Sequence, residues 1–281
     1  MVERNRLLDF VTYAVLLLGV FVVFLPVWVA LVASTQTLDQ VQEVPMSLLP
    51  GAQLLANYSE VLASGSGSSQ AAVRTMLINS LIVALAIPLG KIAISLLSAF
   101  ALVYFRFRSR QWCFWLIFVT LMLPVEVRIM PTYEVMSSLG LINTYTGLTL
   151  PLIASATATF LFRQFFMTIP DELAEAAKID GAGPMRFFWS VVLPLSRTNM
   201  AALFVILFIY GWNQYLWPLL MTTDESMYTV VIGIKRMLTG GDAATEWQLV
   251  MATAILAMLP PVLVVMLMQK WFIKGLVEPE K

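Results

Sequence analysis

The sequence contains no histidine, and Cys113 is the single cysteine among its 281 residues. Without histidine the chain lacks the usual general base, the usual metal ligand and the usual side chain that titrates near neutral pH. A single cysteine excludes an internal disulfide and a metal cluster held by several cysteines. The sequence also contains no Gly-x-Ser-x-Gly and no His-Glu-x-x-His pattern. We therefore expect a chain that is not an enzyme and that holds no metal ion.

Charged residues are also scarce. They make up 12% of the chain, whereas a soluble domain carries roughly a quarter. The 17 basic and 17 acidic residues cancel in net charge, and they form no basic stripe, so nucleic-acid binding is not expected. Hydrophobic residues make up 59%, which indicates that most of the surface faces something other than water.

The apolar residues gather in six runs that are long enough to cross a membrane, because about 20 helical residues span a hydrocarbon core of about 30 Å. In lipid the backbone must satisfy its own hydrogen bonds, so these runs should be helices. The first run is longer than the apolar core of a signal peptide, which favours a retained span. The runs are residues 10–33, 77–103, 112–131, 145–166, 200–221 and 249–271. The prediction is an all-α integral membrane protein with one transmembrane domain, residues 10–271, between short ends at 1–9 and 272–281.

The positively charged residues are distributed unevenly between the two sets of loops. Twelve of the 17 Lys and Arg residues flank the two termini and the connections after the second and fourth runs, and four flank the other connections. The side with more positive charge is normally cytoplasmic, so we expect both termini to be cytoplasmic. Segments 34–76 and 222–248 then lie outside, where they either dock a soluble partner or only cap the helices.

A polar stretch, DELAEAAKIDGAGPMRFFWSVVLPL (residues 171–195), interrupts the apolar chain on the predicted cytoplasmic side. We expect a helix with Pro170 in its first turn. Gly181 should end this helix in the left-handed conformation, and Pro184 should open a second helix that stops near Pro194. Such a helix pair suits either a groove in another protein or the surface of the membrane.

This stretch, within a loop of residues 167–197, resembles the EAA loop of the permease subunits of binding-protein-dependent ABC importers. The matching positions are Glu175, Ala176, Ala177, Gly181, Val191, Leu193 and Pro194. The family usually has isoleucine where this chain has Val191. The resemblance implies a type I importer permease fold with six transmembrane helices, in which this loop is a coupling helix seated in a cleft of an ATPase subunit. The coupling residues that it implies are Glu175, Ala176, Ala177, Asp180 and Gly181.

Further stretches resemble the carbohydrate branch of this family, the relatives of the maltose permeases. They are INSLIVA, SAFALVYFRF, TLMLPVEVRIMPT, SATATFLFRQFFMT and YGWNQYLWPLL. The last three are most similar to permeases for sn-glycerol-3-phosphate, which implies import of this anion, and of glycerophosphodiesters, by alternating access. A neutral sugar or polyol is the alternative within the family. A channel or secondary transporter that works alone is the alternative outside it.

The sequence contains no phosphate-binding loop of the pattern G-x-x-x-x-G-K-[ST]. The single Gly-Lys pair, Gly90–Lys91, is followed by isoleucine inside an apolar run. We therefore expect ATP and Mg²⁺ to bind a partner ATPase rather than this chain. The partners that the resemblance implies are a second, related permease subunit, a dimer of ATPase subunits, an extracytoplasmic solute-binding protein and membrane lipid. It also implies a multi-pass location in a bacterial inner membrane.

Lys91 is the most unusual candidate for a residue on the transport pathway. It lies near the middle of the second apolar run, where a charge costs roughly 2.5–3.5 kcal/mol on insertion scales. Such a residue is expected to face a protein interior or a water-filled cavity. It then contacts either an anionic substrate or a structural partner in this chain or a neighbouring subunit.

Two further groups of polar residues are pathway candidates. Glu126 and Arg128 lie between two prolines, either on the pathway or at a structural bend of a span. Asn213, Gln214 and Tyr215 interrupt the fifth apolar run. Their side chains can form hydrogen bonds either with a polyol or with another helix.

Overall fold

The computed structural model describes residues 6–64, 71–120, 125–239 and 245–277. Within these ranges the chain consists of helices and the turns between them, without a strand. Contacts within the chain divide it into two compact units, and each unit is described by itself. Unit 1 comprises residues 1–76 and 233–259, and unit 2 comprises residues 77–232 and 260–281.

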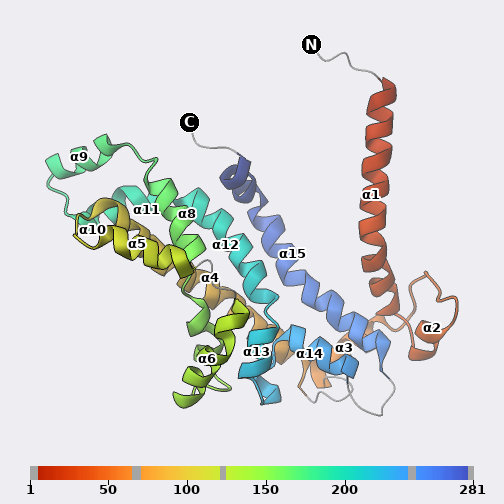
Figure 1. The fold of residues 1–281 in the computed structure, drawn as a ribbon. Coiled ribbons are helices and arrows are strands. Elements are labelled where there is room, and N and C mark those ends of the chain that lie inside the picture. The colour runs from red at the N-terminus through yellow and green to blue at the C-terminus, as the bar shows by residue number, and fades with distance from the viewer. Residues whose placement is uncertain (1–5, 65–70, 121–124, 240–244, 278–281) are drawn as a thin grey trace. The chain divides into compact units, whose positions relative to one another are not determined.

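The helices are labelled in chain order in Figure 1. Short turns of 3-10 helix, η2 and η4, and one turn of π-helix, η3, accompany the α-helices. The elements are α1 (Arg6–Ala33), α2 (Leu38–Gln42), α3 (Leu54–Ser64), α4 (Val73–Tyr104), α5 (Arg110–Val119), α6 (Val125–Ser138), α7 (Tyr145–Thr149), η2 (Leu150–Leu152), α8 (Ala156–Phe166), α9 (Asp171–Ile179), α10 (Pro184–Phe187), η3 (Phe188–Val192), α11 (Leu193–Leu195), α12 (Arg197–Trp212), α13 (Leu216–Met221), η4 (Glu225–Met227), α14 (Val230–Thr239) and α15 (Trp247–Val277).

Some helices in the described part of the chain have the length and composition of membrane spans. Three qualify by themselves: α1 from Asp9, α4, and α15 as far as Lys270. Two bent pairs raise the number to five if each pair counts as one span. α7 with η2 is bent by 48° from α8, and the run Pro184–Leu195 is bent by 69° from α12. The fold therefore combines continuous and broken segments of membrane length.

The predicted apolar runs agree with these helices to different degrees. Three of the runs coincide with α1, α4 and α15, each a single helix. The run 145–166 is broken between η2 and α8, and the run 200–221 is broken between α12 and α13. The run 112–131 is divided between α5 and α6, and residues 121–124 between them lie outside the described residues. A total of six spans therefore stays a prediction.

Helix α4 provides the central packing surface of unit 2. Its buried residues occur in adjacent pairs at intervals of one helical turn, from the pair 83–84 to the pair 99–100. This periodicity is typical of a helix that packs against other helices along one side. At its C-terminal end, the ring centroid of Phe100 lies 5.0 Å from that of Phe188. The end of α4 is thereby packed against the start of η3.

In unit 1, hydrogen bonds from side chains to the backbone hold the segment that follows α1. Nε2 of Gln36 donates to the carbonyl oxygens of Ser47 and Leu49, both at 3.0 Å. Nδ2 of Asn57 donates to the carbonyl oxygens of Ser34 and Gln36, both at 2.9 Å. Buried amide side chains thus replace regular secondary structure as the source of order in this segment.

Asn79, at the N-terminal part of α4 in unit 2, binds the segment that follows α13. Its Nδ2 donates to the carbonyl oxygens of Ser226 at 2.8 Å and of Tyr228 at 3.0 Å. Its Oδ1 accepts a hydrogen bond of 2.7 Å from the hydroxyl of Tyr145. Asn79 is 1% exposed, so these bonds are shielded from water.

Asn143 binds the same segment from the turn before α7. Its backbone has φ of 56°, a left-handed conformation that asparagine tolerates better than most residues. Its N–H donates to the carbonyl oxygen of Met221 at 2.9 Å. Its Oδ1 accepts from the N–H groups of Thr223 at 2.7 Å and Asp224 at 3.1 Å. We call Asn79, Asn143 and their bonds to residues 221–228 the asparagine clamp.

Candidate functional site

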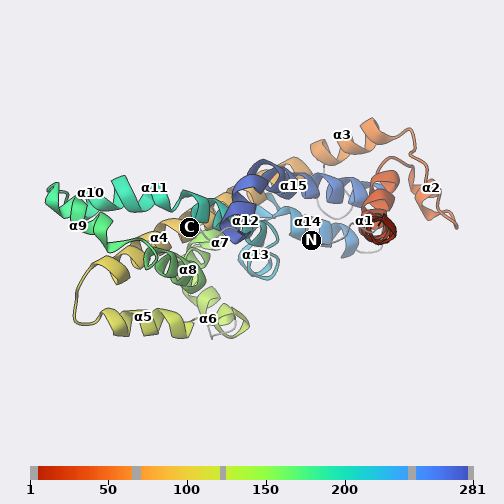
Figure 2. The same cartoon turned by 90° about the horizontal axis from the view of Figure 1, so that it is seen from above.

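The polar EAA stretch forms α9, followed by α10, and these two helices lie next to each other in both views (Figures 1 and 2). The prediction that Pro170 lies in the first turn is wrong. Its ψ of 135° is extended, so the helix begins one residue later, at Asp171. Asp171 and Glu172 occupy the first turn, where negative side chains interact favourably with the positive end of the helix dipole.

The C-terminal end of α9 confirms the predicted role of Gly181. This residue has φ of 71°, a conformation that glycine adopts without a steric penalty. Its N–H donates to the carbonyl oxygen of Lys178 at 3.0 Å, and the N–H of Ala182 donates to that of Ala177 at 2.8 Å. The two bonds together form a Schellman motif, which fixes the direction in which the chain leaves the helix.

Helix α9 has an inner and an outer face. On the inner face, Ala174 and Ala177 lie one turn apart and pack against the buried aromatic cluster around Phe100 and Phe187. On the outer face, Ile179 is 86% exposed. Four residues of the predicted coupling set are also exposed, namely Glu175, Ala176, Asp180 and Gly181, whereas the fifth, Ala177, is half-buried. An apolar side chain exposed to this degree beside acidic residues suits a contact with another protein.

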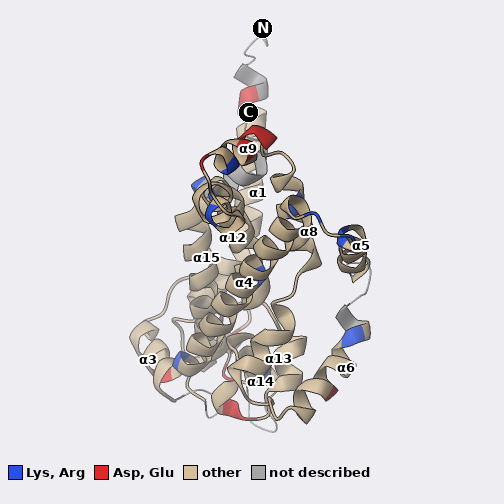
Figure 3. Cartoon of the chain, turned by 90° about the vertical axis from the view of Figure 1, so that its left-hand side faces the viewer, with Lys and Arg blue, Asp and Glu red and all other residues tan. Residues whose placement is uncertain are grey.

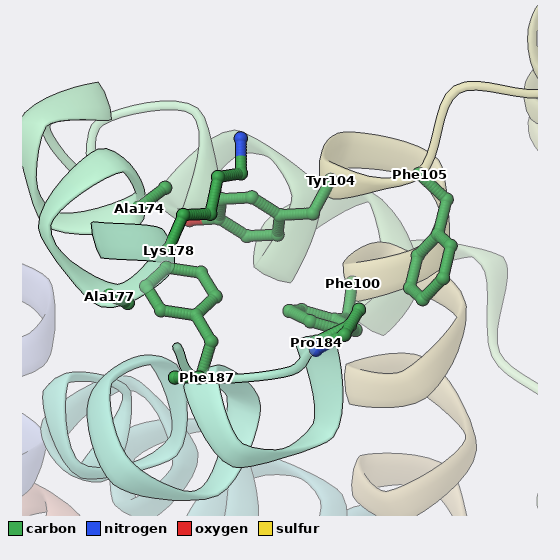
Figure 4. Close-up of a pocket in the computed structure, with 9 residues that line it drawn as sticks. Phe100, Tyr104, Phe105, Ala174, Ala177, Lys178, Pro184 and Phe187 are labelled. Atoms are coloured by element: carbon green, nitrogen blue, oxygen red, sulfur yellow. The ribbon is translucent and has the colours of Figure 1, made fainter. Parts of the chain in front are cut away.

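A cavity of 140 Å³ lies between the inner face of α9 and the end of α4 (Figure 4). Four aromatic rings line it, and alanine side chains line the side toward α9. The lining residues are Phe100, Tyr104, Phe105, Ala174, Ala177, Lys178, Ala182, Pro184 and Phe187. Because alanine fills little volume, α9 rests on the cluster without the close packing of a protein interior.

The helical run that begins at Pro184 ends at Leu195, which confirms the prediction that it stops near Pro194. The N–H of Leu193 donates to the carbonyl oxygen of Phe188, so the chain passes through a π-helical turn and continues as α11 to Leu195. Pro194 lies directly after this π-helical turn and donates no backbone N–H. The run ends one residue later, before the bend of 69° to α12.

Charge is concentrated at the EAA stretch. Figure 3 shows acidic and basic residues gathered on α9, whereas α4, α8 and α12 are almost entirely free of charge along their lengths. A polar helix of this kind belongs in water or against another protein rather than in lipid. This arrangement separates the EAA stretch from the apolar helices that lead to it.

Lys91 lies on the buried side of α4 and is 8% exposed. Its Nζ lies 4.1 Å from the centroid of the Tyr210 ring on α12, which is a cation–π geometry. The two helices approach closely here, since a Cβ atom on Gly211 would lie 3.2 Å from Cα of Ala84. Sequence reasoning missed Tyr210, because no spacing rule connects residues on helices so far apart in the chain.

The other charged candidates lie on α6. Arg128 is exposed, and it acts electrostatically on Lys91. Glu126 has its backbone within α6, but its side chain lies outside the described residues. The electrostatic effect is the connection that the structure gives between Arg128 and Lys91, and the role of Glu126 stays a prediction.

Asn213, Gln214 and Tyr215 occupy the break between α12 and α13. Nε2 of Gln214 donates to the carbonyl oxygen of Tyr210 at 3.2 Å, which places Gln214 beside the partner of Lys91. Asn213 is exposed, and Tyr215 is 37% exposed. Lipid cannot satisfy exposed polar groups, so this surface suits a neighbouring subunit or a water-filled path.

Residues 91–278 match the protein family described as "Binding-protein-dependent transport system inner membrane component". The chain belongs to this family, and it is a permease component of a transport system rather than an enzyme. Within the curated proteins, the sn-glycerol-3-phosphate transport system permease protein UgpE of Yersinia enterocolitica is 58% identical to it over 281 residues. The protein of the same name from Agrobacterium fabrum is 59% identical over 282 residues. Both alignments cover 100% of this chain and 100% of the relative.

A solved structure has the same fold. It is described as a bacterial ABC transporter involved in the import of the acidic polysaccharide alginate. The TM-score is 0.83 at 20% sequence identity, and the match covers 97% of this chain and 99% of the other. The predicted fold, a helical importer permease, is confirmed.

Proposed function

We propose that this chain forms half of the membrane pathway for sn-glycerol-3-phosphate, and for glycerophosphodiesters, in an ATP-driven importer. The observation that carries the proposal is the identity of 58–59% to relatives named for this substrate, over the whole chain. The buried Lys91 and the neighbouring Arg128 are compatible with an anionic substrate. A neutral sugar or polyol is the alternative substrate.

In this proposal α9 couples the pathway to ATP hydrolysis on another chain. Its outer face, with Glu175, Ala176 and Asp180 exposed, docks into the ATPase, and the Schellman turn at Gly181 sets the docking angle. ATP and Mg²⁺ bind the ATPase. Closure of the ATPase dimer then shifts α9, and the spans alternate between inward- and outward-open states because the docked contacts differ between the two.

The complete importer also requires a second, related permease subunit and an extracytoplasmic solute-binding protein. We place the complex in a bacterial inner membrane, with both termini and α9 in the cytoplasm. The excess of Lys and Arg around the termini and the EAA stretch supports this orientation. Membrane lipid covers the remaining apolar surface.

The test is uptake of labelled sn-glycerol-3-phosphate by cells that express the complete importer with wild-type chain or with Glu175→Arg. Reversal of the charge on the outer face of α9 should lower uptake by about tenfold or more. It should also release the ATPase from washed membranes. Glu134→Arg is the matched control, since Glu134 is an exposed glutamate of α6 and should leave uptake close to the wild-type rate.

Each outcome decides a different part of the proposal. Wild-type uptake that Glu175→Arg leaves intact would contradict the role of α9. Uptake of a neutral sugar by the wild-type importer, without uptake of glycerol-3-phosphate, would contradict the substrate and leave the permease class in place.

A further inference from the structure

Lys91 carries a positive charge that its partner in the structure stabilises but does not cancel. Buried lysines are usually neutralised by a carboxylate. The partner of Lys91 within the described residues is instead the Tyr210 ring, at 4.1 Å. A ring attracts a cation through its quadrupole and contributes no negative charge. Among the residues whose side chains the structure describes, the positive charge of Lys91 therefore has no carboxylate to neutralise it.

A second cation adds to this field. Arg128, on α6, is the charged residue that acts on Lys91 from another helix, and the interaction is repulsive. A like charge that acts on the buried Lys91 raises the free energy of the empty site. An anion bound beside Lys91 would offset this repulsion.

Two interrupted segments meet α4 at this level. On one side, the hydroxyl of Ser95 donates to the carbonyl oxygen of Ser155 at 3.3 Å, in the break between η2 and α8. On the other, Tyr210 lies two residues before the end of α12, and Gln214 bonds to its carbonyl oxygen from the break. Interrupted helices near the middle of a membrane are the usual construction of a substrate site in transporters.

We propose that Lys91 is the residue that binds the phosphate group of the substrate within the membrane, with Tyr210 as the residue that positions its ammonium group. The inference rests on the proposed function and assigns a side chain to it. Arg128 strengthens the positive potential at the site. Gln214 and the exposed edge of Tyr210 belong to the surface from which the anion arrives.

The test compares uptake with ATP hydrolysis in liposomes that contain the complete importer, with saturating solute-binding protein, ATP and labelled sn-glycerol-3-phosphate. Lys91→Met keeps the length of the side chain and removes its charge. It should lower uptake by about tenfold or more, while ATP hydrolysis stimulated by the binding protein stays close to the wild-type rate. A side chain with a purely structural role would lower both rates together.

Three further variants sharpen this test. Lys91→Arg keeps the charge and should restore most of the uptake. Tyr210→Phe keeps the ring and should transport normally. Tyr210→Leu removes the ring and should lower uptake, as Lys91→Met does. Lys270→Met is the matched control, because Lys270 is exposed on α15.

Two results would overturn the inference while the proposed function stands. One is wild-type uptake by Lys91→Met. The other is a parallel loss of uptake, ATP hydrolysis and thermal stability in Lys91→Met that Lys91→Arg does not rescue. Absence of glycerol-3-phosphate uptake by the wild-type importer would instead contradict the proposed function, and the inference with it.

Discussion

Different kinds of interaction hold the chain in place at the two ends of unit 2. At one end, α9 rests on aromatic rings through Ala174 and Ala177, above a cavity of 140 Å³. At the other end, the asparagine clamp binds residues 221–228 through directed hydrogen bonds from Asn79 and Asn143. Apolar contacts of this kind tolerate a shift in position, whereas hydrogen bonds weaken steeply when their geometry changes. The α9 end is therefore suited to movement and the clamped end to a fixed position.

The largest expected effect comes from breaking the clamp with Asn79→Leu. The substitution removes three hydrogen bonds from a buried position and should lower stability by about 3 kcal/mol. The measurement is the thermal unfolding midpoint of the purified complex. Asn199→Leu is the control, since the side chain of Asn199 makes no hydrogen bond within the described residues. Equal midpoints for the two variants would show that the clamp does not hold this end.

A smaller effect is expected from Gly181→Ala at the α9 end. The left-handed conformation of Gly181 penalises a side chain by about 1 kcal/mol, although a Cβ atom there would meet no other atom within 4 Å. We expect lower ATP-driven uptake with an almost unchanged unfolding midpoint, because the turn sets the angle of α9 more than the stability of unit 2. Gly183→Ala is the matched control, since Gly183 has φ of −69° and equally open surroundings. Similar uptake by the two variants would contradict this role.

The smallest effect is expected at Asp224, in the segment that the clamp holds. The N–H of Ser226 donates to Oδ1 of Asp224 at 2.9 Å, and this bond lowers the pKa of the exposed carboxyl group. A carboxylate with a lowered pKa stabilises the folded state above the pKa of the unfolded chain, and this contribution is lost as the pH falls through the folded pKa. In the Asp224→Asn variant the thermal unfolding midpoint should therefore fall less steeply as the pH is lowered. Parallel pH profiles for mutant and wild type would contradict the prediction.

The sequence predicted the features of the site that depend on neighbouring residues. The end of α9 at Gly181 follows from the left-handed conformation that glycine adopts easily, and the start of α10 follows from Pro184. Both rules concern a few consecutive residues, so they can be read from the chain alone. The same holds for the exposure of Glu175, which lies on a helix too polar for the membrane.

Features that depend on contacts between distant helices could not be predicted in this way. The pairing of Lys91 with Tyr210 requires the close approach of α4 and α12 at Gly211, which no local pattern encodes. The π-helical turn of Phe188–Val192 before Pro194 was also missed, because no local pattern of residue types predicted it. The breaks inside two apolar runs escaped detection because hydropathy reports length and composition, not continuity.

The π-helical turn η3 also bears on how the preceding chain would respond to a change in its length. A π turn holds about one residue more than an α turn, so the turns on either side of Phe188–Val192 keep nearly the same rotational phase about the helix axis as in a regular helix. Deleting a single residue such as Ser190 from this turn would restore a regular α-helix and leave the preceding chain pointing in nearly the same direction. Deleting a residue from a regular α-helical turn would instead rotate the preceding chain by about 100°. The turn η3 is therefore the place in this helix that tolerates the loss of one residue.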